Sequence, residues 1–254
     1  KKTLLNFLGK IQNNFGFSNK KNSKKINIEF VSANPTGPLH IGHCRGAIYG
    51  DVLSNLLKYC GHNVSKEYYI NDYGNQITLF LKSIYFRAVE IVKKKKFPED
   101  QGLYPGTYII DITKEILKKI NIDDYDNFED AKIALGSIAI DLAMNLIKND
   151  LNIMGIKHDI FTSESAIVRE NILSKAINKL KDKKAIYKGV LPKPKGEIED
   201  WEPREQLLFK ATNYGDDVDR ALQKSDNTWT YFANDIAYHY HKLNREYDHY
   251  INIL

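Results

Sequence analysis

The segment from residue 26 to residue 70 constrains the fold most, because it reads as a strand, a helix and a second strand. Apolar and polar residues alternate in the stretch INIEFV (26–31), which is typical of a strand. Apolar residues then recur at helical spacing from Cys44 to Cys60, Gly61 is suited to end a helix, and NVSKEYYI (63–70) predicts a second strand. Parallel strands need a crossover of this length, and such crossovers are right-handed. We therefore expect an α/β fold with a parallel sheet.

The same patterns predict which faces of these two elements are apolar. The first strand alternates between two sets of residues, Ile26, Ile28 and Phe30 on one face and Asn27, Glu29 and Val31 on the other. The helix carries an apolar set at i, i+3 and i+4 spacing, made of Cys44, Ala47, Ile48, Val52, Leu53, Leu56, Leu57 and Cys60.

The rest of the chain alternates between helical and extended patterns. Helical periodicity covers 74–96, 126–153 and 166–183, and it returns in TYFANDIAYHYHKLNREY. Strands are predicted in HDIFTSES, within residues 185–215 and in YINIL, where the chain stops. The polar, basic stretch 18–25 reads as a linker, and the lysine run 93–96 as a solvated helix end, with an RNA-facing patch as the alternative.

Composition indicates a globular protein and excludes several classes. Apolar residues make up 43% and charged residues 27%, and the formal charge of +5 permits an anionic partner without demanding one. Two cysteines, Cys44 and Cys60, form no CxxC pair, so neither a zinc site nor a disulfide framework is indicated. No run approaches the roughly 18 apolar residues that span a bilayer, and the first residues lack the apolar core of a signal peptide.

Two histidines, His40 and His43, occupy the loop SANPTGPLHIGHCRGA (32–47), between the first strand and the helix. Ligands of open α/β sheets bind at this edge, and a helix N-terminus attracts phosphate. Gly37, Gly42 and Gly46 would let a nucleotide approach the backbone. Residues three apart bring both imidazoles toward one point, where their N–H groups would stabilise charge developing on a phosphate. Taken alone, two such histidines also fit unrelated surface residues or, less well, a metal pair.

The full string is far more specific than the two histidines. HIGH after a strand and a Pro-Gly loop resembles the signature of class I aminoacyl-tRNA synthetases. The longer stretch EFVSANPTGPLHIGHCRGAIYGDVLSNLLKYCGHNVSKEYYINDYGNQI and the later EDWEPREQLLFKATNYGDDVDRALQKSDNTWTYFANDIAYH are similar to arginyl-tRNA synthetases. The resemblance covers the first and last thirds of the chain, and the middle matches only in helical character.

The resemblance implies a Rossmann-type nucleotide-binding domain with a largely helical insertion, incomplete at its C-terminus. It implies activation of L-arginine by ATP, with Mg²⁺ accompanying the ATP, and transfer of the arginyl group to tRNA(Arg). The catalytic residues would be His40 and His43, which stabilise the α-phosphate region, and ATP would also contact Gly42 and Gly46. The arginine carboxylate is itself the nucleophile, so catalysis is positioning and electrostatic stabilisation.

Arginine presents a planar cationic fork, which carboxylates in fixed geometry distinguish from an ammonium group. Glu29 on the first strand and Tyr231 and Asp235, four apart on a predicted helix, suit this task. Without the resemblance, a strand glutamate reads as solvent-facing and a Tyr/Asp pair as surface packing. The resemblance implies that these three residues contact the arginine side chain, and that Ser32 and Asn34 contact its backbone end.

Two further polar groups have less specific meanings. INDYGNQ follows the second strand at the ligand edge, and its Asp72 would help to shape the site or form a simple turn. His239, His241 and His249 near the end invite a metal interpretation. However, His239 and His241 are two apart on a helix and do not face each other, so we expect no protein-bound metal.

The resemblance also predicts how the chain is organised and what it lacks. The expected ranges are the end of an N-terminal module with a linker (1–24), the first half of the catalytic domain (25–80), a helical insertion (81–190) and the start of the second half (191–254). The KMSKS-type loop and the anticodon-binding domain would lie beyond residue 254. We expect a cytoplasmic, monomeric enzyme, whose 254-residue part alone is inactive or weakly active. The alternatives are a nucleotidyltransferase of the HIGH superfamily and a non-catalytic tRNA-binding paralogue.

Overall fold

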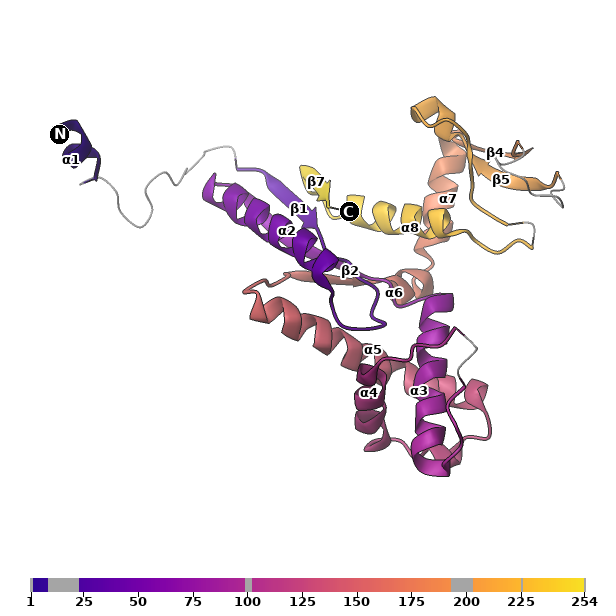
Figure 1. The fold of residues 1–254 in the computed structure, drawn as a ribbon. Coiled ribbons are helices and arrows are strands. Elements are labelled where there is room, and N and C mark those ends of the chain that lie inside the picture. The colour runs from indigo at the N-terminus through magenta and orange to yellow at the C-terminus, as the bar shows by residue number, and fades with distance from the viewer. Residues whose placement is uncertain (1, 9–22, 99–101, 193–202, 225, 254) are drawn as a thin grey trace. The chain divides into compact units, whose positions relative to one another are not determined.

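The computed structural model describes residues 2–8, 23–98, 102–192, 203–224 and 226–253, which form two compact units. One unit consists of Lys1–Ser163 with Tyr247–Leu254, and the other of Glu164–Glu246. A short helix, α1 (Lys2–Leu8), precedes the first unit's sheet in the chain (Figure 1). Most of the predicted linker 18–25 lies outside the described residues. None of the described helices is long and apolar enough to cross a membrane.

A four-stranded parallel sheet forms the centre of the first unit. Its strands are β1 (Lys25–Glu29), β2 (Asn63–Ile70), β3 (Ile160–Ser163) and β7 (His249–Asn252), in the order β3-β2-β1-β7. In register, Ile26 pairs with Val64 on one side and with His249 on the other. This arrangement confirms the predicted α/β fold with a parallel sheet.

Both faces of β1 are buried, so the solvent-facing alternative for Glu29 is wrong. Asn27 is fully buried and Glu29 is only 8% exposed. Hydrogen bonds join the buried polar groups across the strands, because Asn27 Nδ2 donates to Glu67 Oε2 at 2.6 Å and Thr162 Oγ1 donates to Glu67 Oε1 at 2.6 Å. The alternation of β1 therefore separates an apolar face from a hydrogen-bonded polar face, both away from water.

Helix α2 (Ile41–Tyr59) connects β1 to β2 and lies beside them (Figure 1), and only part of its predicted apolar set is buried. Ala47 of that set lies in the core, and Leu53 and Leu57 pack against it. Its buried residues are Ala47, Gly50 and Ser54, whereas three members of the apolar set are more than half exposed: Ile48, Val52 and Leu56. Close packing explains the correction. A Cβ at Gly50 would come within 2.2 Å of the Phe30 ring, so only small residues fit where the helix meets the strand.

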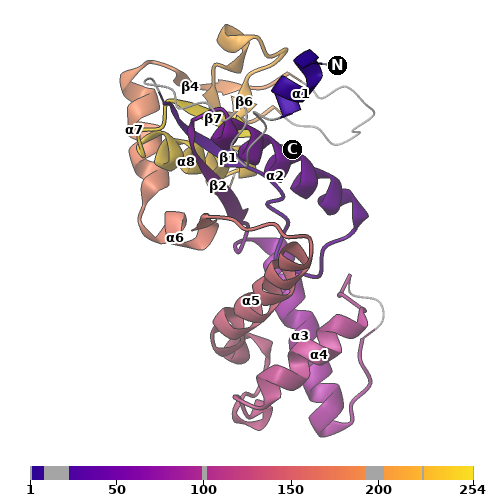
Figure 2. The same cartoon turned by 90° about the vertical axis from the view of Figure 1, so that its left-hand side faces the viewer.

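Three helices of the first unit pack around a core of their own. They are α3 (Asn75–Lys93), α4 (Thr107–Leu117) and α5 (Phe128–Ile153), with a short 3₁₀ turn at Ile122–Asp124 (Figure 2). Fully buried Ile84, Ile109 and Leu135 join them. The sequence predicted α3 and α5, but α4 was not resolved as a separate helix. The lysine run begins at the last residue of α3 and is largely exposed, as predicted for a helix end.

The second unit pairs helices with a small antiparallel sheet. Its elements are α6 (Glu164–Arg169), α7 (Ile172–Asp182), β4 (Ile186–Val190), β5 (Glu205–Phe209), a 3₁₀ turn (Ala211–Tyr214), β6 (Arg220–Ala221) and α8 (Tyr231–Leu243). The sheet order is β4-β5-β6, and Ile177, Leu222 and Ala233 form its core with α7 and α8. The single helix predicted over 166–183 is two helices, because Asn171 adopts a left-handed conformation between them.

Candidate functional site

The two histidines of the loop cap the N-terminus of α2. His40 is the N-cap residue, and its Nδ1 accepts the N–H of Gly42 at 3.1 Å. His43 Nδ1 accepts the N–H of His40 at 3.2 Å, which completes a reciprocal capping box. This motif is normally built from Ser or Thr with Glu or Gln. Here two imidazoles satisfy helix N–H groups that would otherwise lack partners.

Capping leaves the opposite nitrogen of each ring as a donor. Because Nδ1 accepts a hydrogen bond in both neutral rings, the proton of each lies on Nε2. The rings stack with centroids 3.6 Å apart and an angle of 19° between their planes. Partial burial, and secondarily the neighbouring His40, lower the pKa of His43. The pair therefore offers neutral N–H donors beside the positive end of a helix, an arrangement suited to phosphate oxygens.

Two glycines near the histidines differ in what surrounds them. A Cβ at Gly42 would lie 3.0 Å from His40 Cε1 and 3.1 Å from His40 Nδ1, so the absence of a side chain makes room for the capping imidazole. A Cβ at Gly46 would meet no atom of the chain within 4 Å. A requirement for glycine at Gly46 would therefore come from a ligand rather than from the fold.

The residues after β1 form the second part of the site. Ser32 donates its hydroxyl to Glu29 Oε1 at 3.1 Å, and its Oγ accepts the N–H of Tyr69 at 3.0 Å. Val31 and Ser32 both have positive φ, at 69° and 39°, which turns the chain sharply at the end of the strand. Two hydrogen bonds through the Ser32 hydroxyl thus connect the carboxylate of Glu29 to the neighbouring strand β2.

One cavity of about 710 Å³ joins these two parts. Glu29 and Ser32 contribute from β1 and its turn, while Gly42, His43 and Gly46 contribute from the start of α2. A carboxylate and an imidazole suited to donate to phosphate therefore face the same space. Its remaining lining residues are Val31, Arg45, Tyr49 and Ile253.

Sequence reasoning missed Arg45 and Tyr49 as lining residues. They follow Gly42 at spacings of three and seven on α2, which places all three on one face of the helix. Helical periodicity counted from the first turn, rather than from the apolar residues, would have identified them. Val31 and Ile253 had no comparable signal in the sequence.

Asn34 and Asp72 lie on loops at the carboxyl ends of β1 and β2. Asn34 Nδ2 donates to the Gln76 side chain at the start of α3. Asp72 accepts a hydrogen bond from Ser163 Oγ at 2.7 Å, at the end of β3. These bonds tie together the loops that follow the parallel strands, at the edge where ligands of such sheets bind.

Tyr231 and Asp235 lie on α8 of the second compact unit, four residues apart and both exposed. Thr230 caps this helix through a bond from the N–H of Ala233 to its Oγ1, which fixes the first turn where Tyr231 lies. No group of three or more His, Cys, Asp or Glu side chains within the described ranges is arranged to hold a metal ion.

Comparisons with known proteins agree with the motif. The family model described as tRNA synthetases class I (R), catalytic domain, matches residues 7–253. The arginine–tRNA ligase of Pelagibacter ubique is 56% identical over 98% of this chain and 44% of its own length, and that of Ehrlichia chaffeensis is 51% identical over 91% and 40%. The chain thus spans less than half the length of these relatives.

Solved structures give the same result. A Campylobacter jejuni structure described as an arginyl-tRNA synthetase matches with a TM-score of 0.82 and 34% identity, over 99% of this chain and 53% of that one. The arginyl-tRNA synthetase of Thermus thermophilus shares the fold, with a TM-score of 0.57 and 19% identity over 94% and 38%. With the family model covering nearly every residue, the chain belongs to the catalytic-domain family of the class I arginyl-tRNA synthetases.

Proposed function

We propose that the protein containing this chain activates L-arginine with ATP and transfers the arginyl group to tRNA(Arg). The cavity at the end of β1 carries the proposal, because it places Glu29 and His43 around one space of about 710 Å³. The family relationship supports the reaction class. The proposed cytoplasmic location and monomeric state follow from the resemblance alone.

In the proposed first step, an oxygen of the arginine carboxylate forms a bond to the α-phosphorus of ATP. The bond between the α-phosphorus and the bridging oxygen breaks, and pyrophosphate leaves with that electron pair. His40 and His43 would donate Nε2–H bonds to phosphate oxygens whose charge changes in the transition state. Their capping bonds hold both rings in place before the substrate arrives, so little reorganisation is needed.

ATP would lie against the start of α2, with Gly42 and Gly46 allowing close approach of the backbone. Mg²⁺ would arrive with ATP, where it would neutralise phosphate charge. Transfer would then attach the arginyl group to a hydroxyl of tRNA(Arg) and release AMP.

Arginine would be bound by groups that differ in their chemistry at its two ends. Glu29, buried and held by Ser32, would pair with the guanidinium. The resemblance alone adds Tyr231 and Asp235 as residues that would contact the arginine side chain. Ser32 and Asn34 would contact the backbone end, and Asp72 would help to shape the site. A carboxylate suits a guanidinium because the planar fork can donate two parallel hydrogen bonds to its two oxygens.

ATP–pyrophosphate exchange with the intact protein and tRNA(Arg) tests the proposal. Exchange that depends on arginine, and not on lysine, is expected. Asp235→Asn should raise the KM for arginine by at least about tenfold and leave the KM for ATP unchanged, because a hydrogen bond to a charged group contributes about 1.5–3 kcal/mol. Exchange without arginine dependence would contradict the proposed function, whereas an unchanged arginine KM in the variant would contradict only the role of Asp235.

A further inference from the structure

The chain makes a strained three-residue turn directly after β1. The Ser32 N–H donates to the Phe30 carbonyl oxygen at 3.0 Å, which closes a γ-turn, and Val31 at its centre has φ of 69°. This form of the γ-turn is rare and strained. A β-branched residue at positive φ is a genuine outlier. Such a conformation persists only where the surrounding structure holds it.

His158 supplies a contact that holds this turn. It lies just before β3, and its Nε2 is 3.2 Å from the same Phe30 carbonyl oxygen. A carbonyl oxygen only accepts hydrogen bonds, so the proton must lie on Nε2 and the imidazole donates. The Phe30 oxygen therefore receives one hydrogen bond from within the turn and another from a residue 128 positions along the chain.

Aromatic rings fix the orientation of the His158 imidazole. Its centroid lies 4.2 Å from that of Phe30, 5.4 Å from that of Tyr68 in an edge-on contact, and 5.9 Å from that of Phe161. Burial lowers the pKa of His158 to about 4, so the ring is neutral near pH 7. A neutral ring has one N–H, and the contact with Phe30 requires it on Nε2.

The turn determines where Ser32 places its hydroxyl. That hydroxyl donates to Glu29 Oε1 and accepts the N–H of Tyr69 on the adjacent strand. If the turn relaxed, Ser32 would move away from both partners, and the Glu29 carboxylate would lose one of its contacts. The geometry points to His158 as a positioning residue, which holds Glu29 and Ser32 in place for the amino acid through the carbonyl of Phe30.

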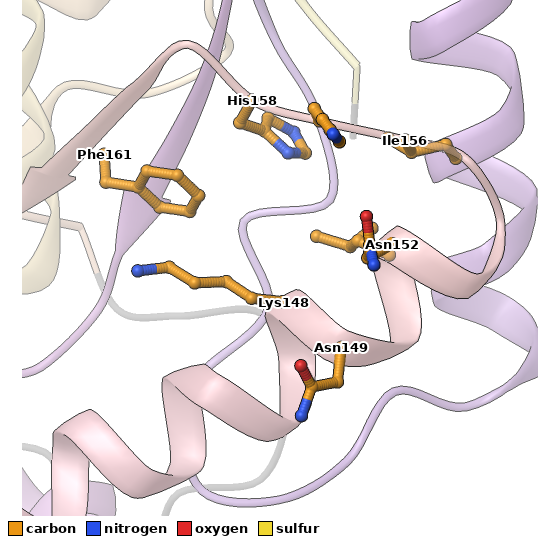
Figure 3. Close-up of a pocket in the computed structure, with 8 residues that line it drawn as sticks. Lys148, Asn149, Asn152, Ile156, His158 and Phe161 are labelled. Carbon is orange, nitrogen blue, oxygen red and sulfur yellow. The ribbon is translucent and has the colours of Figure 1, made fainter.

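The side of His158 away from the turn borders a separate cavity of about 330 Å³ (Figure 3). Lys148, Asn149 and Asn152 line this cavity from the last turns of α5, and Figure 3 shows the Lys148 side chain extending toward Phe161, which lines another side. Lys148 Nζ lies 4.5 Å from the centre of the Phe161 ring. The cavity gives room for a side chain of different shape at position 158 without crowding the core.

A pair of substitutions separates the hydrogen bond from the volume of the side chain. In His158→Gln the amide nitrogen can reach the Phe30 carbonyl as Nε2 does, whereas His158→Met has similar length and no donor. Lys157→Ala is the control, since Lys157 is exposed and borders the same cavity. The intact protein is assayed by ATP–pyrophosphate exchange for the KM of arginine and of ATP, and by residue-resolved amide hydrogen exchange at Ser32 and Tyr69.

We expect His158→Met to raise the KM for arginine about fivefold, the size expected for one neutral hydrogen bond, with the KM for ATP within twofold of wild type. His158→Gln and Lys157→Ala should remain near wild type in both. The Ser32 and Tyr69 amides should exchange about fivefold faster in His158→Met alone. Equal rises in both KM values, or a Gln variant that behaves like Met, would show that His158 only fills space and would overturn the inference.

The inference rests on the proposed function in its kinetic part only. If the wild-type protein shows no arginine-dependent exchange, the proposed function fails, and amide exchange alone decides the role of His158. Faster amide exchange in His158→Met but not in His158→Gln would then support the conclusion that the His158 hydrogen bond stabilises the turn. Equal exchange in the two variants would overturn it.

Discussion

The cavity of about 710 Å³ is lined at one end by the start of α2 and at the other by the turn after β1. The side chains at these two ends are held in place by different kinds of hydrogen bond. At the end proposed to bind phosphate, the bonds that orient His40 and His43 join residues two and three apart in the chain. At the end proposed to bind the amino acid, the bonds that orient Ser32 and Phe30 come from residues 37 and 128 positions away. The first end is complete as soon as the helix forms, whereas the second needs the sheet assembled through β3.

This difference predicts which substitutions should disturb each end of the cavity. Local capping bonds survive distant changes, because the first turn of α2 contains both partners. Long-range bonds at the turn depend on strands brought together by the whole sheet and on a backbone conformation that costs about 1–3 kcal/mol. Substitutions far from the cavity should therefore affect arginine binding before they affect ATP.

The largest effect is expected from His43→Ala, which removes one of the two proposed hydrogen-bond donors to phosphate. Loss of a preorganised transition-state donor costs about 10²–10³-fold in rate, so single-turnover adenylate formation should fall by that factor. Arginine affinity, measured by equilibrium dialysis, should stay unchanged, because the contacts of Glu29 and Ser32 do not involve His43. Lys58→Ala, at the far end of the same helix, is the control. A parallel loss of arginine affinity would mean that the two ends are not separately held.

Acidification tests the other end through His158. The pKa of this side chain is about 4 in the folded protein and about 6.5 when unfolded, so between these values only the unfolded chain binds the proton. The free energy of unfolding should therefore be fully retained above about pH 6.5 and should fall by up to about 3 kcal/mol as the pH drops toward 4. Urea unfolding at a series of pH values measures this fall. His158→Gln lacks the titrating group, so identical pH dependence in both proteins would contradict the prediction.

The smallest effect is expected from Gly42→Ala, compared with Gly46→Ala. An added methyl at Gly42 presses on the His40 ring and should weaken one capping bond, which slows adenylate formation by about threefold to tenfold. At Gly46 the methyl meets nothing in the protein, so any rise in the KM for ATP reports contact with the nucleotide. Single-turnover rates and ATP titrations distinguish the two. An unchanged rate in Gly42→Ala would show that the cap tolerates displacement of the ring.

The sequence predicted those parts of the fold that depend on local pattern. Strand β2 has the predicted bounds, and α3 and α5 begin and end within a few residues of their predicted limits. The apolar set predicted on α2 includes Ala47, Leu53 and Leu57, which do pack in or against the core. The spacing missed Gly50, where contact with Phe30 leaves no room for a side chain, because hydrophobic spacing does not report how closely two backbones approach. Burial of Glu29 also depended on partners across the sheet.

The same distinction between local pattern and long-range contact applies to the residues of the site. His40 and His43 could be placed at the start of a helix from the sequence, although the capping box they form could not, since histidine is not a usual member of that motif. Nothing in the sequence indicated the turn at Val31, because valine disfavours positive φ. His158 gave no signal either, since its role arises from a carbonyl 128 residues away.

The turn at Val31 also matters for engineering the protein toward higher thermostability. Glycine at this position would remove the steric penalty of the positive φ, but it would add freedom to the unfolded chain and delete a valine side chain that packs against the core of the sheet. Where relief of the strain is the larger effect, a search guided by melting temperature would favour Gly at 31. The glycine would at the same time loosen the segment that positions Ser32 and Glu29. The variant would then gain thermostability and lose affinity for arginine.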